Sequence, residues 1–405
     1  METTLTPPAD LESLRGRALK VGIAGAVACA IAFVIDRDHF FRSWLIAYLL
    51  FLGIALGSMA LLMIQHLSGG QWGIFRRIFE ASARTVPFMA VLFLPIIAGM
   101  RTLFPWTHPE LVATDHILQN KEIYLNTGFF LARALFYFVG WSALVYTLTK
   151  WSKRQDDGEM SVNLPIQRLS GFGLVFYALT VTFAGVDWIM SLNPHWYSTL
   201  FGFLMMGGQG LSALTFTIVV SQYLSQRPPM SDLLKPHHFH DLGKLSLAFV
   251  MLWAYFNFSQ FLLTYAANLV EEVPYFLSRM DHGWQYLAIF LVLFHFFVPF
   301  FLLLSRDNKR AASRLVMIAC WILFVRYVDI YMLVSPEFAS TGANLHMLEG
   351  GEHASHFFVH WTDLAAPIGI GGLWTWMFAT QLLQRPLLAF RDPYLRESLQ
   401  SSGGH

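Results

Sequence analysis

Charged residues are scarce in this sequence of 405 residues: Asp, Glu, Lys and Arg together make up 13%, and the formal net charge is +1. This composition lacks the concentrated charge that nucleic-acid binding or an acidic soluble partner would require. Only two cysteines, Cys29 and Cys320, are present, far apart and each inside an apolar run. They cannot build a disulfide framework, a zinc site, an iron–sulfur site or a CxxCH haem attachment within this chain. Any metal centre that carries electrons would therefore belong to partner proteins.

Long polar segments are also lacking. No connector between apolar stretches exceeds about 26 residues, so we expect partners to dock onto loops and helix ends, not onto an extramembrane domain. Hydrophobic residues, by contrast, make up 55% of the chain. Ten apolar stretches of about 18–25 residues match the roughly 30 Å hydrocarbon thickness at about 1.5 Å rise per residue. The sequence therefore predicts an all-α integral membrane protein with about ten transmembrane helices.

The predicted spans are 18–35, 43–65, 84–101, 126–150, 169–191, 196–223, 243–268, 283–304, 312–334 and 361–383. No small-residue cleavage pattern follows the first apolar run, so we expect a retained helix after an N-terminal segment, 1–17. Most of the 27 Lys and Arg fall in that segment, the even-numbered connectors and the tail, 384–405. By the positive-inside rule, both termini are expected in the cytoplasm and the connector 335–360 is expected to be an outer loop.

Two predicted span ends resemble each other. VTFAGVDWIMSLNP (181–194) and ILFVRYVDIYMLVSP (322–336), aligned on Asp187 and Asp329, share valine one residue before, methionine three after and proline seven after. Four spans separate them. This spacing predicts two four-helix bundles in parallel repeat, 43–191 (spans 2–5) and 196–334 (spans 6–9), with 18–35 and 361–383 as peripheral helices. The alternative is that helices ending at the outer interface often finish in polar residues and proline.

Polar and ionisable side chains within spans are costly unless paired or hydrated, so they are candidate functional residues. They gather in the outer half of the predicted spans, and we expect few comparable residues in the inner half. The set consists of Arg133, Asp187, Asn257, Gln260, His295, Arg326 and Asp329.

Each member of this set also has a purely structural interpretation. The two Arg–Asp pairs can neutralise each other for packing alone. His295 can be a hydrogen-bonded core histidine, and Asn257 and Gln260 can join helices by hydrogen bonds. In the expected outer loop, His353, His356 and His360 stand at helical spacing, but no cysteine or fixed acid completes a ligand set. We therefore predict a partner contact there and no metal site.

Four segments carry a family resemblance: HLSGGQWG (66–73), DWIMSLNPHWYSTLFG (187–202), HFHDLGKLSLAFVMLWAYFNFSQFLLTYAANLVEEVPYF (238–276) and APIGIGGLWTW (366–376). With the ten spans, the chain resembles the NrfD-type membrane subunits of alternative complex III, a quinol:cytochrome c oxidoreductase, and among them its quinone-binding subunit 2 (the ActF type). The likeness covers nearly the whole chain, and 238–276 is its most specific part.

The resemblance implies two four-helix bundles plus two peripheral helices, in the bacterial inner membrane. It implies partners: a related NrfD-like subunit, pentahaem and monohaem cytochrome c subunits, an iron–sulfur subunit and small membrane subunits. Such assemblies oxidise menaquinol or ubiquinol and pass electrons to cytochrome c or to a terminal oxidase. No covalently bound cofactor is expected in this chain.

Quinol oxidation releases two protons and two electrons, so a site needs bases near the outer surface and an apolar slot open to lipid. We expect Asp187, with Arg133 setting its ionisation, to accept or relay protons, and Asp329 with Arg326 to repeat that arrangement. His295, Asn257 and Gln260 would continue a hydrogen-bonded path inward.

A quinol, if bound, is expected beside Asp187, Trp188 and His195. Two other functions remain open. One is a purely structural scaffold of the complex without its own quinone site. The other is a solute transporter, which the parallel sense of the apparent repeat disfavours.

Overall fold

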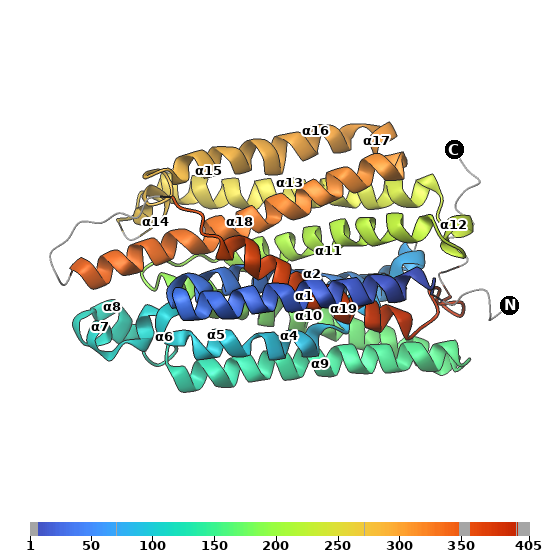
Figure 1. The fold of residues 1–405 in the computed structure, drawn as a ribbon, viewed down its shortest axis with the longest axis horizontal. Coiled ribbons are helices and arrows are strands. Elements are labelled where there is room, and N and C mark those ends of the chain that lie inside the picture. The colour runs from blue at the N-terminus through green and yellow to red at the C-terminus, as the bar shows by residue number, and fades with distance from the viewer. Residues whose placement is uncertain (1–6, 70, 271, 348–356, 394, 396–405) are drawn as a thin grey trace.

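The computed structural model describes residues 7–69, 71–270, 272–347, 357–393 and 395. In this part of the chain all regular secondary structure is helical, and nine helices are long and apolar enough to cross a membrane. Figure 1 shows them side by side, with their long axes running the same way through the molecule. The predicted all-α membrane architecture is confirmed at this level.

Seven of the nine are built on one long helix each: α1 (Asp10–Ile35), α2 (Arg37–Ser68), α9 (Thr127–Asp156), α10 (Asn163–Trp188), α11 (Phe201–Ser225), α13 (Pro236–Ala267) and α18 (Ala312–Met347). The span of α10 also includes the short helices that flank it, Met160–Val162 and Met190–Leu192. Two are built from consecutive segments: η2 (Gln71–Phe75), α3 (Arg76–Ala83), α4 (Val86–Leu92) and α5 (Leu94–Ala98); and α15 (Trp284–Leu291), the π-helical η6 (Val292–Phe297) and α16 (Val298–Leu304). The tenth predicted span, α19 (Thr362–Leu383), is long enough but less hydropathic than these nine.

Short helices lie between these elements. They are α6 (Met100–Leu103), η3 (Pro105–Thr107), α7 (Pro109–Thr114), α8 (His116–Lys121), η4 (Met160–Val162), η5 (Met190–Leu192), α12 (Met230–Leu233), α14 (Val273–Leu277) and α17 (Arg306–Arg310). Proline stands at the start of α4 and α5. Because proline has no N–H to donate, it interrupts the backbone hydrogen bonds of the preceding helical segment. The third span is therefore a chain of short helical segments.

The helix α2 forms the centre of the molecule. In its most apolar window 89% of residues are buried, and it packs against α10, α11, α18 and α19. The corresponding fraction is 17% in α13 and 22% in Trp284–Leu304, where Tyr255, Phe258 and Phe301 are exposed. We call α2–α10 the N-terminal half and α11–α18 the C-terminal half; α13, α15 and α16 form the outward face of the latter.

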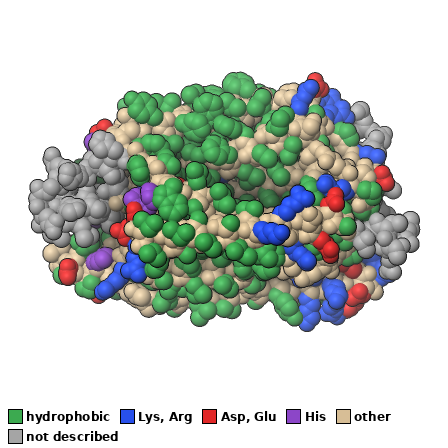
Figure 2. All heavy atoms as spheres, in the orientation of Figure 1, with side chains coloured by type: hydrophobic (Ala, Val, Ile, Leu, Met, Phe, Trp, Pro, Cys, Tyr) green, Lys and Arg blue, Asp and Glu red, His purple; other side chains and the backbone are tan. Residues whose placement is uncertain are grey.

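The two ends of the helix bundle differ in charge. Arg227 pairs with Asp10 at the start of α1 (3.1 Å), and Arg385, after α19, pairs with Glu80 of α3 (3.2 Å). These residues mark one end, called here the tail end, whereas α7, α8 and α14 lie at the opposite, loop end (Figure 1). Figure 2 shows hydrophobic side chains over the middle of the molecule and more Lys and Arg toward the tail end.

The two helices that were predicted to be peripheral, α1 and α19, pack directly on each other. A Cβ added to Gly25 would lie 2.4 Å from the Gly369 nitrogen, and one added to Gly372 would lie 2.4 Å from the Gly22 nitrogen. Small residues allow such close backbone approach between membrane helices. The first and last helices of the described chain are therefore neighbours.

Several helices run past the predicted span ends. The helix α1 starts at Asp10, and α18 continues through Pro336 to Met347, into the expected outer loop. The predicted ends were too short because hydropathy marks where a helix leaves an apolar medium. It does not mark where the backbone hydrogen bonds of the helix end. His353 and His356 of that loop, and 396–405 of the expected tail, lie outside the described residues.

Candidate functional site

The first predicted pair, Arg133 and Asp187, is a closed ion pair. Arg133 donates from Nε to Oδ2 of Asp187 and from Nη2 to Oδ1, both at 2.9 Å, and Tyr137 donates its hydroxyl to Oδ2 at 2.9 Å. The guanidinium carbon lies 3.9 Å from the ring centre of Tyr124 and 4.3 Å from that of Phe129. Asp187 is fully buried, and both of its oxygens are occupied. This is the arrangement that a buried structural ion pair requires.

The three expected quinol contacts do not form one site. Trp188 is buried, with its ring 4.8 Å from Phe93 and stacked on Phe138. His195 lies instead at the surface of the loop end, where its Nε2 is 2.6 Å from Oδ2 of Asp115. His195 is therefore a partner of Asp115, not of Asp187.

The second predicted pair, Arg326 and Asp329, lies beside aromatic side chains of α13. Arg326 Nη1 pairs with Asp329 Oδ2, and Trp253 donates from Nε1 to the same oxygen at 3.2 Å. His295 stacks on Trp253, with ring centres 3.9 Å apart and planes at 26°. The structure thus assembles three candidate residues, Arg326, Asp329 and His295, around one tryptophan.

His295 occupies an unusual backbone position. It lies in the π-helical turn Val292–Phe297, and such turns occur frequently at functional sites. The side chain is fully buried, and neither ring nitrogen has a hydrogen-bond partner among the described residues. The structural interpretation of His295 as a hydrogen-bonded core residue is therefore not supported by its contacts.

Asp329 also faces a cavity of about 240 Å³ in the C-terminal half. Its walls come from α13, α14, α15, α18 and the segment before α11, and most of them are apolar. The polar side chains among them are Ser198, Asn257, Gln260, Arg279 and Asp329. Met280 and Val292 also line it and are each 50% exposed, so the cavity opens on the outward face. A carboxylate and a guanidinium therefore border one apolar slot.

Arg279 and Glu337 are site residues that the sequence analysis did not identify. Arg279 donates from Nη2 to Oε1 of Glu337 at 2.6 Å, and its guanidinium lies 3.5 Å from the ring centre of Tyr275. Both residues lie beyond the apolar windows, in segments that were expected to be outer connectors. The available signal was helical spacing: Glu337 stands eight residues after Asp329, on the same face of α18.

Gln260 starts a hydrogen-bonded line that leads from the cavity toward the loop end. Ser198 donates to Gln260 Oε1 at 2.5 Å, and Gln260 donates to Thr264 at 3.4 Å. Thr264 donates in turn to Glu272 Oε2 at 3.3 Å. Asn257 instead bonds within its own helix, to the Trp253 carbonyl at 2.9 Å. Gln260, rather than Asn257, thus connects the cavity to the loop end, whereas the path was expected to run inward.

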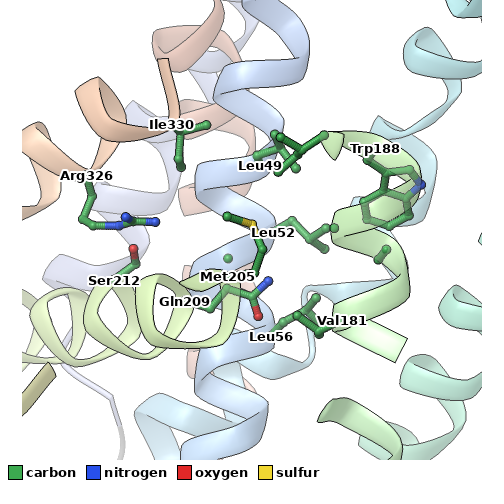
Figure 3. A pocket seen from close by; sticks show the side chains of 14 residues that line it. Leu49, Leu52, Leu56, Val181, Trp188, Met205, Gln209, Ser212, Arg326 and Ile330 are labelled. Carbon is green, nitrogen blue, oxygen red and sulfur yellow. The ribbon is translucent and has the colours of Figure 1, made fainter. Parts of the chain in front are cut away.

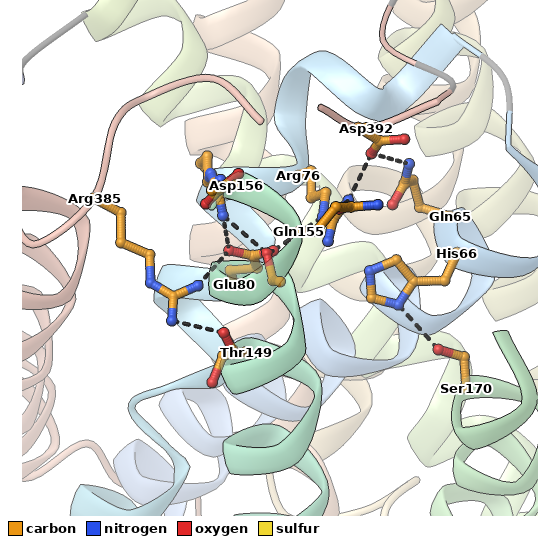
Figure 4. A network of polar contacts seen from close by, with 12 residues as sticks. Gln65, His66, Arg76, Glu80, Thr149, Gln155, Asp156, Ser170, Arg385 and Asp392 are labelled. Atoms are coloured by element: carbon orange, nitrogen blue, oxygen red, sulfur yellow. Dashed lines mark hydrogen bonds and ion pairs between the residues drawn. The ribbon is translucent and has the colours of Figure 1, made fainter. Parts of the chain in front are cut away.

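A second charge network lies at the tail end, where most Lys and Arg were expected in connectors and the tail (Figure 4). Arg76 pairs with Glu80 (3.0 Å) and Asp392 (2.8 Å), and Arg77 pairs with Glu80 at 2.6 Å. Arg385 reaches the same carboxylate. Residues 66–83 were expected to be a connector, but η2 and α3 fold into the bundle, so Arg76, Arg77 and Glu80 are buried. The spacing of Arg76 and Glu80, one helical turn apart among apolar residues, was the signal.

A smaller cavity, of about 30 Å³, lies between α2, α10, α11 and α18 (Figure 3). Most of its lining is apolar. Its polar side chains are Gln209, Ser212 and Arg326, and Tyr177 donates its hydroxyl to Gln209 Oε1 at 2.9 Å. This cavity lies where the two halves of the molecule meet.

Neither metal-ligand geometry nor comparison with known proteins assigns a function to the chain. Within the described ranges, no group of three His, Cys, Asp or Glu side chains could hold a metal ion. No protein-family model matches the chain, and no curated protein matches it. The proposal of a function therefore depends on the residues described above and on the resemblance of the four quoted segments.

Proposed function

We propose that the chain is an NrfD-like membrane subunit of a quinol-oxidising electron-transfer complex, and that quinol binds in the cavity beside Asp329. The observation that supports this is the cavity itself: a carboxylate and a guanidinium border an aromatic, apolar slot that opens on the outward face. A quinol headgroup is a flat ring with a hydroxyl at each of two opposite positions. The two charged groups suit two polar ends, and the apolar walls suit the ring.

The volume of the cavity suits the headgroup of a quinol better than a whole quinol with its isoprenoid tail. Pockets for drug-sized ligands are roughly 300–1,000 Å³, and this cavity has about 240 Å³. The isoprenoid tail would therefore leave past Met280 and Val292 into lipid. This differs from the site first expected beside Asp187, because that carboxylate is fully buried and occupied.

The chemistry assigned to the chain is proton acceptance. Asp329 would accept the proton of one hydroxyl, with Arg326 and Trp253 holding the carboxylate in place. The second hydroxyl would lie at the Arg279 end of the slot, and its proton would be accepted by Glu272, the carboxylate at the end of the hydrogen-bonded line from Gln260 through Thr264. Two electrons would leave the ring for a haem or an iron–sulfur cluster of a partner subunit, leaving quinone. His295, stacked on Trp253, would be a further proton carrier near Asp329.

We also propose the location, orientation and assembly. The tail end would face the cytoplasm of a bacterial inner membrane, because Lys and Arg gather there, and protons would leave at the loop end. The partners would be the related NrfD-like subunit, the cytochrome c subunits, the iron–sulfur subunit and small membrane subunits. The two halves would be the parallel four-helix repeats.

A second candidate function, a scaffold without its own quinone site, is favoured by a specific observation. The Arg133–Asp187 pair and the tail-end network have the closed geometry of packing interactions. If the Asp329 pair served the same purpose, its substitution would change assembly and leave turnover of the assembled complex intact.

The experiment compares Asp329→Asn with Asp187→Asn in the intact complex. We expect Asp329→Asn to lower quinol:cytochrome c turnover at least about tenfold without loss of assembly, since a positioned base contributes about 10²–10⁴-fold. Asp187→Asn should lower the amount of complex more than its turnover. Unchanged turnover and proton release in Asp329→Asn would refute the quinol proposal. Unchanged turnover and proton release in Asp187→Asn would remove Asp187 and Arg133 from the predicted proton chemistry.

A further inference from the structure

Gly208 of α11 makes room for the Arg326 side chain. A Cβ added to Gly208 would lie 2.2 Å from Arg326 Nη2 and 2.7 Å from Cζ. The guanidinium is buried and cannot move away without leaving Asp329. At the adjacent Gly207 an added Cβ would only reach the Phe256 ring at 3.5 Å, an ordinary contact. Of these two neighbouring glycines, only Gly208 positions Arg326.

One donor of Arg326 has no partner in the described part of the protein. Nη1 pairs with Asp329, but Nε is buried without a hydrogen bond. Leaving a buried donor unsatisfied is costly, and most such groups in proteins bond to protein or to ordered water. Arg326 lines the cavity of about 30 Å³ and extends from α18 toward α11, where Ser212 and Gln209 lie (Figure 3).

The cavity satisfies both requirements for a buried water. Its volume exceeds the roughly 10–15 Å³ that one water needs, and it offers polar groups within the usual number of two to four. Ser212 donates its own hydroxyl proton to the Gly208 carbonyl at 2.9 Å, so its oxygen can accept another. Gln209 Oε1 already accepts from Tyr177, which leaves the Gln209 amide nitrogen as a donor.

We propose that this cavity is the binding site of an ordered water molecule. The water accepts hydrogen bonds from the Arg326 guanidinium and the Gln209 amide and donates one to Ser212 Oγ. It completes a line from Tyr177 of the N-terminal half, through Gln209 and Arg326, to Asp329 of the C-terminal half. The line couples the two halves through hydrogen bonds, and it does not depend on quinol binding.

The direct test is a density map of the intact protein in lipid, at a resolution that resolves waters. We expect a peak at hydrogen-bonding distance, about 2.7–3.2 Å, from a nitrogen of the Arg326 guanidinium and from Gln209 or Ser212. The peak should disappear in Gln209→Leu, whose side chain fills the space, while the Arg326–Asp329 pair remains. Absence of the peak in the unmodified protein, or its persistence in Gln209→Leu, would overturn the proposal.

The glycine pair tests the position of Arg326 separately. Gly208→Ala should lower the thermal unfolding temperature by several degrees or prevent folding, because the methyl group displaces the guanidinium from Asp329 and from the water. Gly207→Ala is the matched control and should unfold close to the unmodified protein. Equal unfolding temperatures for the two variants would contradict the role of Gly208 and with it the position of the Arg326 guanidinium at the cavity.

Discussion

Tyr275 lies flat against Trp196, with ring centres 3.7 Å apart and planes at 7°, and Arg279 covers the opposite face of Tyr275. All three residues line the cavity of the C-terminal half, and Glu337 fixes the arginine at 2.6 Å. Desolvation raises the pKa of Tyr275 to about 12, although the nearby Arg279 acts to lower it, so the hydroxyl stays protonated at neutral pH. The stack is thus a neutral, flat wall held by a buried ion pair.

Glu337→Gln should release Arg279 from this stack. We expect KM for quinol to rise with a smaller change in kcat, because Arg279 is placed to bind the ring rather than to accept a proton. The measurement is steady-state quinol:cytochrome c kinetics of the assembled complex. Glu159→Gln, at an exposed pair with Arg154 at the tail end, serves as the control and should leave both constants unchanged. A fall in kcat at constant KM would argue against a binding role.

Asp392→Asn should destabilise the tail end. Arg76 would lose one of its two buried carboxylate partners, and breaking a buried pair costs about 3–5 kcal/mol. Because Arg76 keeps Glu80, we expect the lower end of that range, read as a fall in the thermal unfolding temperature. Glu159→Gln is again the comparison, since its surface pair is screened by solvent. Equal losses in both variants would show that Asp392 is not part of a buried network.

Gly25→Ala should separate α1 from α19. The new methyl would meet the backbone of Gly369 at 2.4 Å, and overpacking of this kind costs about 1–3 kcal/mol. Gly16→Ala makes the same change in the same helix, with no atom within 4 Å, and should be neutral or stabilising by up to about 1 kcal/mol. Thermal unfolding of both variants measures the difference. A stable Gly25→Ala protein would contradict the close pairing of the two helices.

The Asp115–His195 contact should make the loop end sensitive to acid. Burial alone would raise the pKa of Asp115, but the Leu118 N–H, His195 and the Ile117 N–H hold it below 3.8. A carboxyl with a lowered folded-state pKa stabilises the protein above its unfolded value, and that contribution is lost as pH falls through the folded value. Asp115→Asn should therefore lower stability at pH near 7, and this difference should shrink as pH falls below the unfolded value of about 3.9. A pH-independent effect would mean that the charge of Asp115 is unimportant.

The residues of the two predicted pairs could be foreseen because charged side chains inside apolar windows have few alternatives to pairing. Arg326 and Asp329 are three residues apart, and Arg133 and Asp187 lie on consecutive helices, so their contacts follow from local geometry. The place of the cavity does not follow, since it depends on where α13, α14 and α18 leave space. Arg279 and Glu337 were missed because hydropathy carries no information beyond the apolar windows. The parallel repeat, the quinone chemistry and the partners stay predictions.

The network at the tail end joins side chains that are synthesised far apart in time. Arg76 and Glu80 enter the membrane with the third span, whereas Arg385 and Asp392 follow α19. Until translation has passed residue 392, the early arginines lack part of their countercharge. A nascent chain stalled before that point would therefore leave Arg76 with Glu80 as its remaining buried carboxylate partner, so the tail completes a network that the third span begins.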